Sequence, residues 1–292
     1  MDGGVNLALL VFFVLLLALG CYALWDSEQV YQKASESYTQ YRPDNKENLS
    51  FNELVAINPE VFGWLNVYGT PIDYPLVQGQ NNEKYINTTA KGEFALSGAI
   101  FLDYRNARDF SDFNSIVFGH HMDKNAMFGD LTHFNDQSYF DARQYGTINY
   151  GGVDHGIEIF AFLKADAYDA ELYTPGLEIE FDRKNYLDHL RELAVHWREV
   201  GVSTSDHIVL MSTCTSASTN GRELLAARIT DEIHPNPFGE PSENTEHTPG
   251  FWDHLKDFFA RFNAWPFVLP VLMILPAAIL KIRRRRQHRK QG

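Results

Sequence analysis

Cysteine is scarce in this chain of 292 residues: there are two, Cys21 and Cys214, so no set of disulfides can hold the fold together. Cys21 lies in an apolar segment near the N-terminus, whereas Cys214 lies in a polar region far along the chain. We therefore expect no intrachain disulfide, and Cys214 is the one thiol of the polar body. A lone cysteine of this kind is either a small buried apolar side chain or a reactive nucleophile.

Basic residues are also scarce before the C-terminus. Residues 1–280 contain 18 Lys and Arg against 38 Asp and Glu, and the other seven basic residues all follow residue 280. An acidic body argues against nucleic acid as a partner. The sequence has no internal repeat and no ligand spacing typical of a metal site, so we expect neither a cofactor nor a metal.

Long apolar segments occur near both ends of the chain. Residues 6–25 carry no charge and are long enough to span a bilayer as a helix. Residues 265–280 form a second apolar run, and the basic cluster that follows predicts a cytoplasmic tail by the positive-inside rule. Two spans place the body outside the cell and its lipid contacts at the two ends. A cleaved signal peptide is the alternative for the first segment, but it lacks a basic start, so we favour a retained anchor.

Composition divides the chain into six parts. They are an N-terminal transmembrane anchor or uncleaved signal (residues 1–25), a helical connector (26–60), a folded domain (61–233), a proline-containing linker (234–257), a C-terminal transmembrane segment (258–282) and a basic cytoplasmic tail (283–292).

The body reads as mainly β. Short apolar runs are separated by clusters of Gly, Asn, Asp and Pro, which is typical of a sandwich or barrel. The predicted strands cover residues 62–67, 74–77, 99–102, 115–118, 156–163, 208–212 and 224–229. We also expect a short helix over residues 51–58, capped by Ser50, and a long one over residues 183–199, capped by Asp182. The long helix precedes the strand that carries Cys214 and would lie against the barrel.

Four polar residues stand at or just beyond the ends of predicted strands. Cys214 follows the strand 208–212, and Arg222 begins the next one, so both should lie at the same edge of the sheet. An arginine stays protonated, so it can stabilise negative charge but cannot act as a base. His120 and His121 follow the strand 115–118. Adjacent residues on a strand point to opposite sides, so only one of these histidines can face Cys214. A surface loop or a metal site at this pair are the alternatives.

Several motifs follow one another in a fixed order along residues 61–229. They are FGWL at 62–65, IDYPLVQG at 72–79, IFLDYRN at 100–106, FGHHM at 118–122 and MFGDL at 127–131. The strand end Ser212-Thr213-Cys214, followed by Arg222, completes the series. In order and spacing these motifs resemble the class B sortases, which are cysteine transpeptidases of Gram-positive cell surfaces. Leu210 stands where the family pattern often has its first threonine.

The resemblance implies a fold and a set of roles. The fold is a closed sortase-type β-barrel with N-terminal helices, flanked here by transmembrane helices. Cys214 would be the nucleophile, His120 the acid and base, and Arg222 the group that stabilises the oxyanion. The substrates implied are surface proteins or pilins with a C-terminal sorting signal. The acceptor amine would come from a peptidoglycan precursor or from a pilin lysine, and specificity would reside in residues 80–97 and 165–182.

One feature departs from class B. A second membrane span with a basic tail is usual in class C sortases, which polymerise pilins, whereas the class C lid motif is missing here. A sortase dedicated to pilus polymerisation is therefore an alternative. Two further alternatives are a papain-like hydrolase, in which the cysteine would precede the histidine, and a surface-binding module without catalysis.

Overall fold

A computed structural model describes residues 3–34, 38–43, 49–122, 125–214 and 220–239 of the chain. The chain separates into two units, one holding residues 1–29 and 242–292 and the other Val30–Pro241. The predicted C-terminal transmembrane segment and basic tail lie outside the described residues, as does most of the linker.

The first helix, α1, runs from Gly3 to Ala34. Its segment Gly4–Ala23 is the one helix in the described part of the chain that is long and apolar enough to cross a membrane. Its leucine, valine and phenylalanine side chains are mostly exposed. A water-exposed surface of this kind is unfavourable, so these side chains need an apolar environment.

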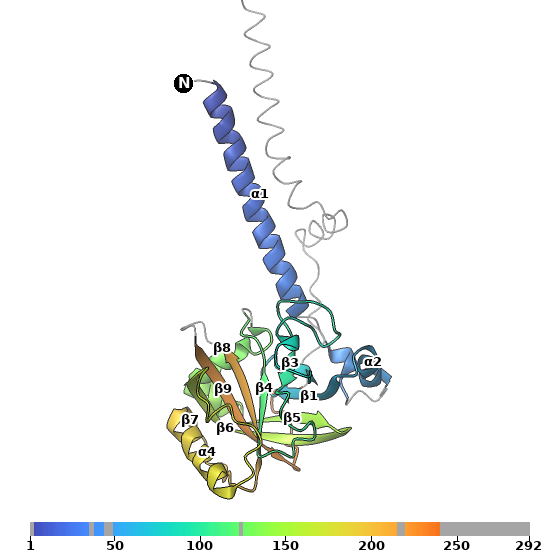
Figure 1. Cartoon of the computed structure of the whole chain (residues 1–292), viewed down its shortest axis with the longest axis vertical. Coiled ribbons are helices and arrows are strands. Elements are labelled where there is room, and N and C mark those ends of the chain that lie inside the picture. Colours follow the sequence, from blue (N-terminus) through green and yellow to red (C-terminus); the bar gives the residue numbers. More distant parts are fainter. Residues whose placement is uncertain (1–2, 35–37, 44–48, 123–124, 215–219, 240–292) are drawn as a thin grey trace, which may run out of the picture. The chain divides into compact units, whose positions relative to one another are not determined.

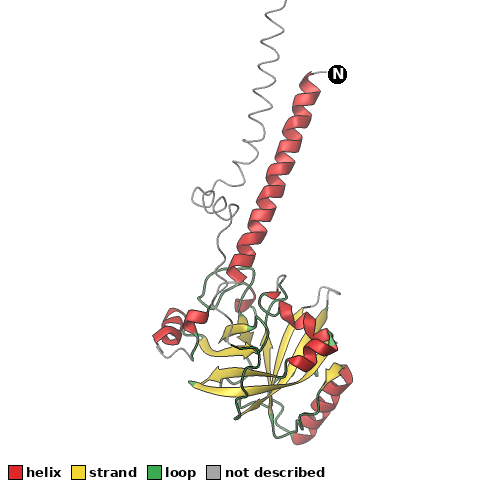
Figure 2. Cartoon of the chain, turned by 180° about the vertical axis from the view of Figure 1, so that it is seen from behind, coloured by secondary structure: helices red, strands yellow, loops and turns green. Residues whose placement is uncertain are grey.

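Nine strands form one sheet. They are β1 (Val61–Val67), β2 (Asp73–Val77), β3 (Ile100–Leu102), β4 (Asn114–Phe118), β5 (Tyr145–Tyr150), β6 (Val153–Asp166), β7 (Ala194–Trp197), β8 (His207–Cys214) and β9 (Gly221–Thr230). Their order is β5-β1-β2-β3-β4-β8-β9-β6-β7, and β5 also pairs with β6. That extra pairing closes eight strands into the predicted barrel, and β7 is added to β6 outside the circuit (Figure 2).

All seven predicted strands are present, and the structure adds β5 and β7. Two of the pairings, β2–β3 and β4–β8, are parallel, and the rest are antiparallel. β6 changes partner along its length, because its first half pairs with β5 and its second half with β7. A bulge in its pairing with β9, between Ile159 and Ala161, accompanies this change.

Helices cover the barrel on two sides (Figure 1). They are α2 (Leu49–Ile57), α3 (Gln137–Ala142) and α4 (Glu180–Leu193), with 3-10 helices at Thr39–Tyr41, Lys84–Ile86 and Gly129–Asn135. Two predicted boundaries were wrong. Ser50 lies inside α2 instead of capping it. The long helix begins before Asp182 and ends at Leu193, because Trp197 belongs to β7.

The strands separate two apolar cores. Val209 and Met211 of β8 point into the barrel, whereas Ile208 and Leu210 point outward beneath α4. Tyr186 and Leu190 of α4 fill this outer core. Burial on both faces explains why β8 is an unbroken apolar run in the sequence. Ser212 and Cys214 continue the outward-facing row, which brings the thiol to the outer rim of the barrel.

Candidate active site

Cys214 is the last residue of β8, and its side chain is exposed and forms no disulfide. The alternative of a buried apolar cysteine is therefore wrong. β8 is otherwise buried from Ile208 to Thr213, so the strand is fixed by packing up to the residue before the thiol. A nucleophile on a rigid strand end keeps its position without being covered.

Arg222 is the direct cross-strand partner of Cys214 in the antiparallel β8–β9 pair. Directly opposed residues project from the same face of a sheet, so thiol and guanidinium lie side by side as the sequence predicted. Nη1 of Arg222 donates to the backbone oxygen of Gly221 at 2.9 Å, which holds the guanidinium close to its own strand.

His120 reaches the same rim from β4. The parallel β4–β8 pair aligns Phe118 with Ser212, and the Gly119 amide donates to the Ser212 oxygen at 3.2 Å. A Cβ at residue 119 would lie 2.7 and 2.8 Å from Cδ2 and Cγ of the buried Phe128 ring, so a larger residue there would force this ring to shift. The ladder therefore continues one residue beyond the strand and delivers His120 beside the end of β8.

The imidazole of His120 is oriented by a backbone carbonyl. Nε2 lies 2.7 Å from the oxygen of Ile86. A carbonyl oxygen can only accept a hydrogen bond, so Nε2 carries the proton in this contact. Nδ1 is then the nitrogen that gains or loses a proton, and the carbonyl fixes the tautomer that makes this so.

His121 does not share the site. It forms an isolated bridge with Met127, and it does not line the cavity that contains His120. The prediction that only one of the two histidines faces Cys214 is confirmed. Within the described ranges, no group of three or more His, Cys, Asp or Glu side chains is arranged to hold a metal ion.

One cavity of about 360 Å³ brings the predicted residues together. Cys214, His120 and Arg222 all line it. Its other walls include Asn82, Ile86, Phe101, Asp103, Arg105, Phe118, Ala167, Tyr173, Ser212 and Thr213. Mostly apolar walls with a few convergent polar groups are typical of a ligand site.

Sequence reasoning missed Tyr173, which lies between β6 and α4. Its hydroxyl lies 2.8 Å from Oγ of Ser212, and its ring stacks on Phe118. Burial raises the pKa of the Tyr173 phenol, and the nearby Cys214 adds to this, against the opposing influence of Ser212 and Arg222. The phenol therefore stays neutral and can donate a hydrogen bond. The sequence predicted that residues 165–182 help to set specificity, but nothing in it distinguishes Tyr173 from its neighbours.

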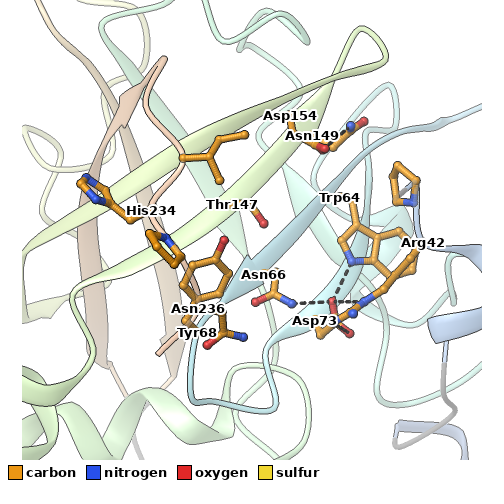
Figure 3. A pocket seen from close by; sticks show the side chains of 13 residues that line it. Arg42, Trp64, Asn66, Tyr68, Asp73, Thr147, Asn149, Asp154, His234 and Asn236 are labelled. Carbon is orange, nitrogen blue, oxygen red and sulfur yellow. Dashed lines mark hydrogen bonds and ion pairs between the residues drawn. The ribbon is translucent and has the colours of Figure 1, made fainter. Parts of the chain in front are cut away.

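A second cavity, of about 380 Å³, lies on the outer face of β1, β2 and β5 (Figure 3). Asp73 lies at one side of it and accepts hydrogen bonds from Trp64, Asn66 and Arg42 at 2.8 to 3.0 Å. Residues 233–236, which follow β9, also line it. It contains none of the residues that the sequence predicted for catalysis.

Three known proteins that this chain resembles are described as sortase B or class B sortases. No family model matches the chain. It is 33% identical over 208 residues to Sortase B of Listeria monocytogenes, which covers 70% of this chain and 82% of that protein. The structure of sortase B from the Type II pilus of Streptococcus pneumoniae matches at 49% identity and a TM-score of 0.55, covering 62% and 99% of the two chains. A Streptococcus pyogenes class B sortase involved in pilus biogenesis matches at 40% identity and a TM-score of 0.57, covering 63% and 100%.

Proposed function

This chain belongs to the class B sortases and is a cysteine transpeptidase, and we propose that Cys214, His120 and Arg222 carry out its reaction. The observation that carries the proposal is their convergence on one cavity from the ends of β4, β8 and β9. A papain-like hydrolase and a binding module without catalysis do not fit this family.

The first half of the reaction forms a thioester. The Cys214 thiolate attacks the carbonyl carbon of a peptide bond in a sorting signal, and the electron pair of the C=O bond moves onto oxygen. Arg222 donates hydrogen bonds to this oxyanion. As the C–N bond breaks, Nδ1–H of His120 gives its proton to the departing amine. The acyl group is then bound to sulfur and His120 is neutral.

The second half transfers the acyl group to a new amine. The incoming amine attacks the thioester carbonyl, and neutral His120 accepts its proton at Nδ1. Arg222 stabilises the second oxyanion, the C–S bond breaks, and a new amide is released. Cys214 returns to the thiolate and His120 to the protonated form, so the cycle needs no other reagent.

We infer that the substrates are surface proteins or pilins and that a pilin lysine is the favoured acceptor. The support is sequence identity. The Streptococcus pneumoniae sortase from a pilus and the Streptococcus pyogenes sortase involved in pilus biogenesis are 49% and 40% identical to this chain, whereas the Listeria protein is 33% identical. An amine of the peptidoglycan precursor is the competing acceptor. Incubating the protein with each amine and an acyl donor would separate them by the mass of the product.

We also infer that α1 anchors the protein in the cell membrane with its catalytic unit outside. The apolar segment Gly4–Ala23 supports this, since it has the length and composition of a span. Together with a second span near the C-terminus, it would place the basic tail in the cytoplasm. Protease accessibility of the two ends in intact cells tests this topology.

The decisive test replaces the nucleophile. With peptides copied from C-terminal sorting signals of the same cell, the wild-type chain should gain the mass of one acyl group on Cys214, and Cys214→Ala should gain none. Cys21→Ser is the matched control, because it removes the other thiol and should leave the acylation unchanged. Full transpeptidation by Cys214→Ala would overturn the assignment.

A further inference from the structure

The cavity around Cys214 has a fully buried carboxylate in its wall. Asp103 directly follows β3, and its side chain is 0% exposed. Oδ1 accepts from Nε and the backbone amide of Arg105 at 2.9 and 3.0 Å, and Oδ2 accepts from Nη2 of Arg105 at 2.7 Å. Nδ2 of Asn82 adds a fourth bond, at 3.0 Å. Burial alone would raise the pKa of Asp103, but the bonds from Arg105 and Asn82 outweigh it and lower the pKa.

Arg105 connects this carboxylate to one wall of the cavity. Its Nη2 also donates to the backbone oxygen of Tyr173 at 3.1 Å, which lies 68 residues further along the chain. Tyr173 belongs to residues 167–179, between β6 and α4, and its side chain lines the cavity beside Ser212. The guanidinium therefore holds the backbone of this segment at the residue that faces the nucleophile.

Asn82 connects the same carboxylate to the opposite wall. While its Nδ2 binds Asp103, its Oδ1 accepts from the backbone amide of Tyr104 at 3.0 Å. Asn82 stands just before the 3-10 helix Lys84–Ile86, whose last residue supplies the carbonyl that orients His120. Both segments that the sequence predicted to set specificity are thus tied to one side chain.

We propose that Arg105 is a positioning residue that, through its pair with Asp103, fixes the separation of the segments 82–86 and 167–179 and so sets the width of the substrate cavity. The inference rests on the proposed function of this cavity. An exposed ion pair would have little effect. Here one partner is fully buried, and Arg105 bridges two segments that are otherwise far apart in the chain, so its loss frees one wall and leaves a buried charge short of partners.

The chain offers a matched control in Arg108. Arg108 and Arg105 are both exposed residues of the same loop, and the Arg108 side chain donates to Oε1 and the backbone oxygen of Gln78 at 2.9 and 3.0 Å. Arg108 does not line the cavity. Arg108→Ala therefore removes two hydrogen bonds from the same loop, and neither of them is made to Asp103, Asn82 or Tyr173.

Hydrogen exchange of the full chain in detergent tests the positioning role without any substrate. In Arg105→Ala we expect the amides of residues 82–86 and 173–176 to exchange about tenfold faster, with the rest of the barrel unchanged. Arg105→Lys should fall between, because an ammonium cannot bridge Asp103 and Tyr173 in the same way. Unchanged exchange in both segments, or equal acceleration in Arg108→Ala, would overturn the proposal.

The kinetic readout uses the sorting-signal peptide that acylates wild-type Cys214. Arg105→Ala should raise KM about tenfold and change kcat less than about threefold, because the reacting groups stay in place while the walls loosen. An equal loss of kcat in both Arg105 and Arg108 variants would mean general destabilisation and contradict the proposal. If wild-type Cys214 is never acylated, the proposed function fails, whereas the exchange result still judges the role of Arg105.

Discussion

The cavity that contains Cys214 and the cavity drawn in Figure 3 enclose similar volumes, about 360 and about 380 Å³, but their polar groups are used differently. In the second cavity Arg42 and Asp73 bind one another and are both largely buried. In the first, the Cys214 thiol is exposed and unpaired. The size of a cavity therefore says less about function than the groups that its own structure leaves unused.

The two cavities also differ in which part of the strands lines them: strand faces in one and strand ends in the other. Around Asp73, the faces of β1, β2 and β5 are crossed by the chain segment that follows β9, so side chains meet other side chains. Around Cys214, strands end, and Gly119, Cys214 and Arg222 stand where the ladder finishes. Strand ends present side chains from several elements to one point, which suits a reaction that needs three different groups.

Among the substitutions that distinguish the two cavities, we expect His120→Ala to cause the largest loss of activity. In the proposed mechanism His120 protonates the departing amine, so its loss should lower kcat/KM about a thousandfold. His121→Ala is the matched control and should stay within about twofold of the wild type, because His121 does not line the cavity. Steady-state rates with a sorting-signal peptide and an amine measure both. Equal losses in the two variants would contradict the assignment of His120.

Arg222→Lys should have the next largest effect, a fall of about a hundredfold in kcat/KM. Lysine keeps the charge but lacks the planar fork that donates to an oxyanion and to the strand backbone at once. The thiol should still be alkylated by iodoacetamide, which reports that the fold and Cys214 are intact. Full activity in this variant would mean that charge alone is required.

Asp73→Asn tests the second cavity and should affect stability instead of activity. An amide removes the negative charge that Asp73 presents to the Arg42 guanidinium, and we expect a loss of about 2 kcal/mol in the free energy of unfolding. Activity per folded molecule should not change. Asp154→Asn is the control: Asp154 is exposed and binds only Asn149 among the contacts described, at 2.7 Å, so about 0.5 kcal/mol is expected. A loss of activity in Asp73→Asn would link the two cavities.

The smallest expected effect is a change in the free energy of unfolding at low pH. The pKa of Asp103 is lowered in the fold, so its ionised form stabilises the protein above the usual range of aspartate, and this contribution disappears as the pH falls through the lowered pKa. The difference in unfolding free energy between wild type and Asp103→Asn, about 1 kcal/mol near neutral pH, should shrink in acid. Urea unfolding at a series of pH values measures it, and a constant difference would exclude the ionised pair as its cause.

The sequence was sufficient for the strand ends but not for how the barrel closes. Cys214 and Arg222 could be placed at the same edge of the sheet because the first ends one predicted strand and the second begins the next. β5 was missed because it contains Gly146, which weakens a strand signal. Glycine is required there, since a Cβ would lie 2.2 Å from the backbone oxygen of Asn66 on β1. That requirement exists only once the barrel has formed.

Tertiary contacts also explain the misplaced helix boundary. Residues 183–199 contain apolar residues at helical spacing, so the pattern predicts one helix up to Glu199. In the structure, Trp197 instead pairs with Ala161 of β6 and packs edge-on against Phe160. Similarly, the importance of Asp103 and Tyr173 depends on two loops meeting, which no local pattern records.

The parallel pairing of β4 with β8 has a consequence for when this enzyme becomes active. It joins Phe118 to Ser212, about ninety residues apart, and β8 must fit between β4 and β9. Contacts over such sequence distances are slow to form, because the long chain between the two strands must first be closed into a loop. Until they form, the Cys214 thiol has neither His120 nor Arg222 beside it. A growing or partly folded chain therefore carries an unassisted cysteine, and its chemistry begins only when the last strands are in place.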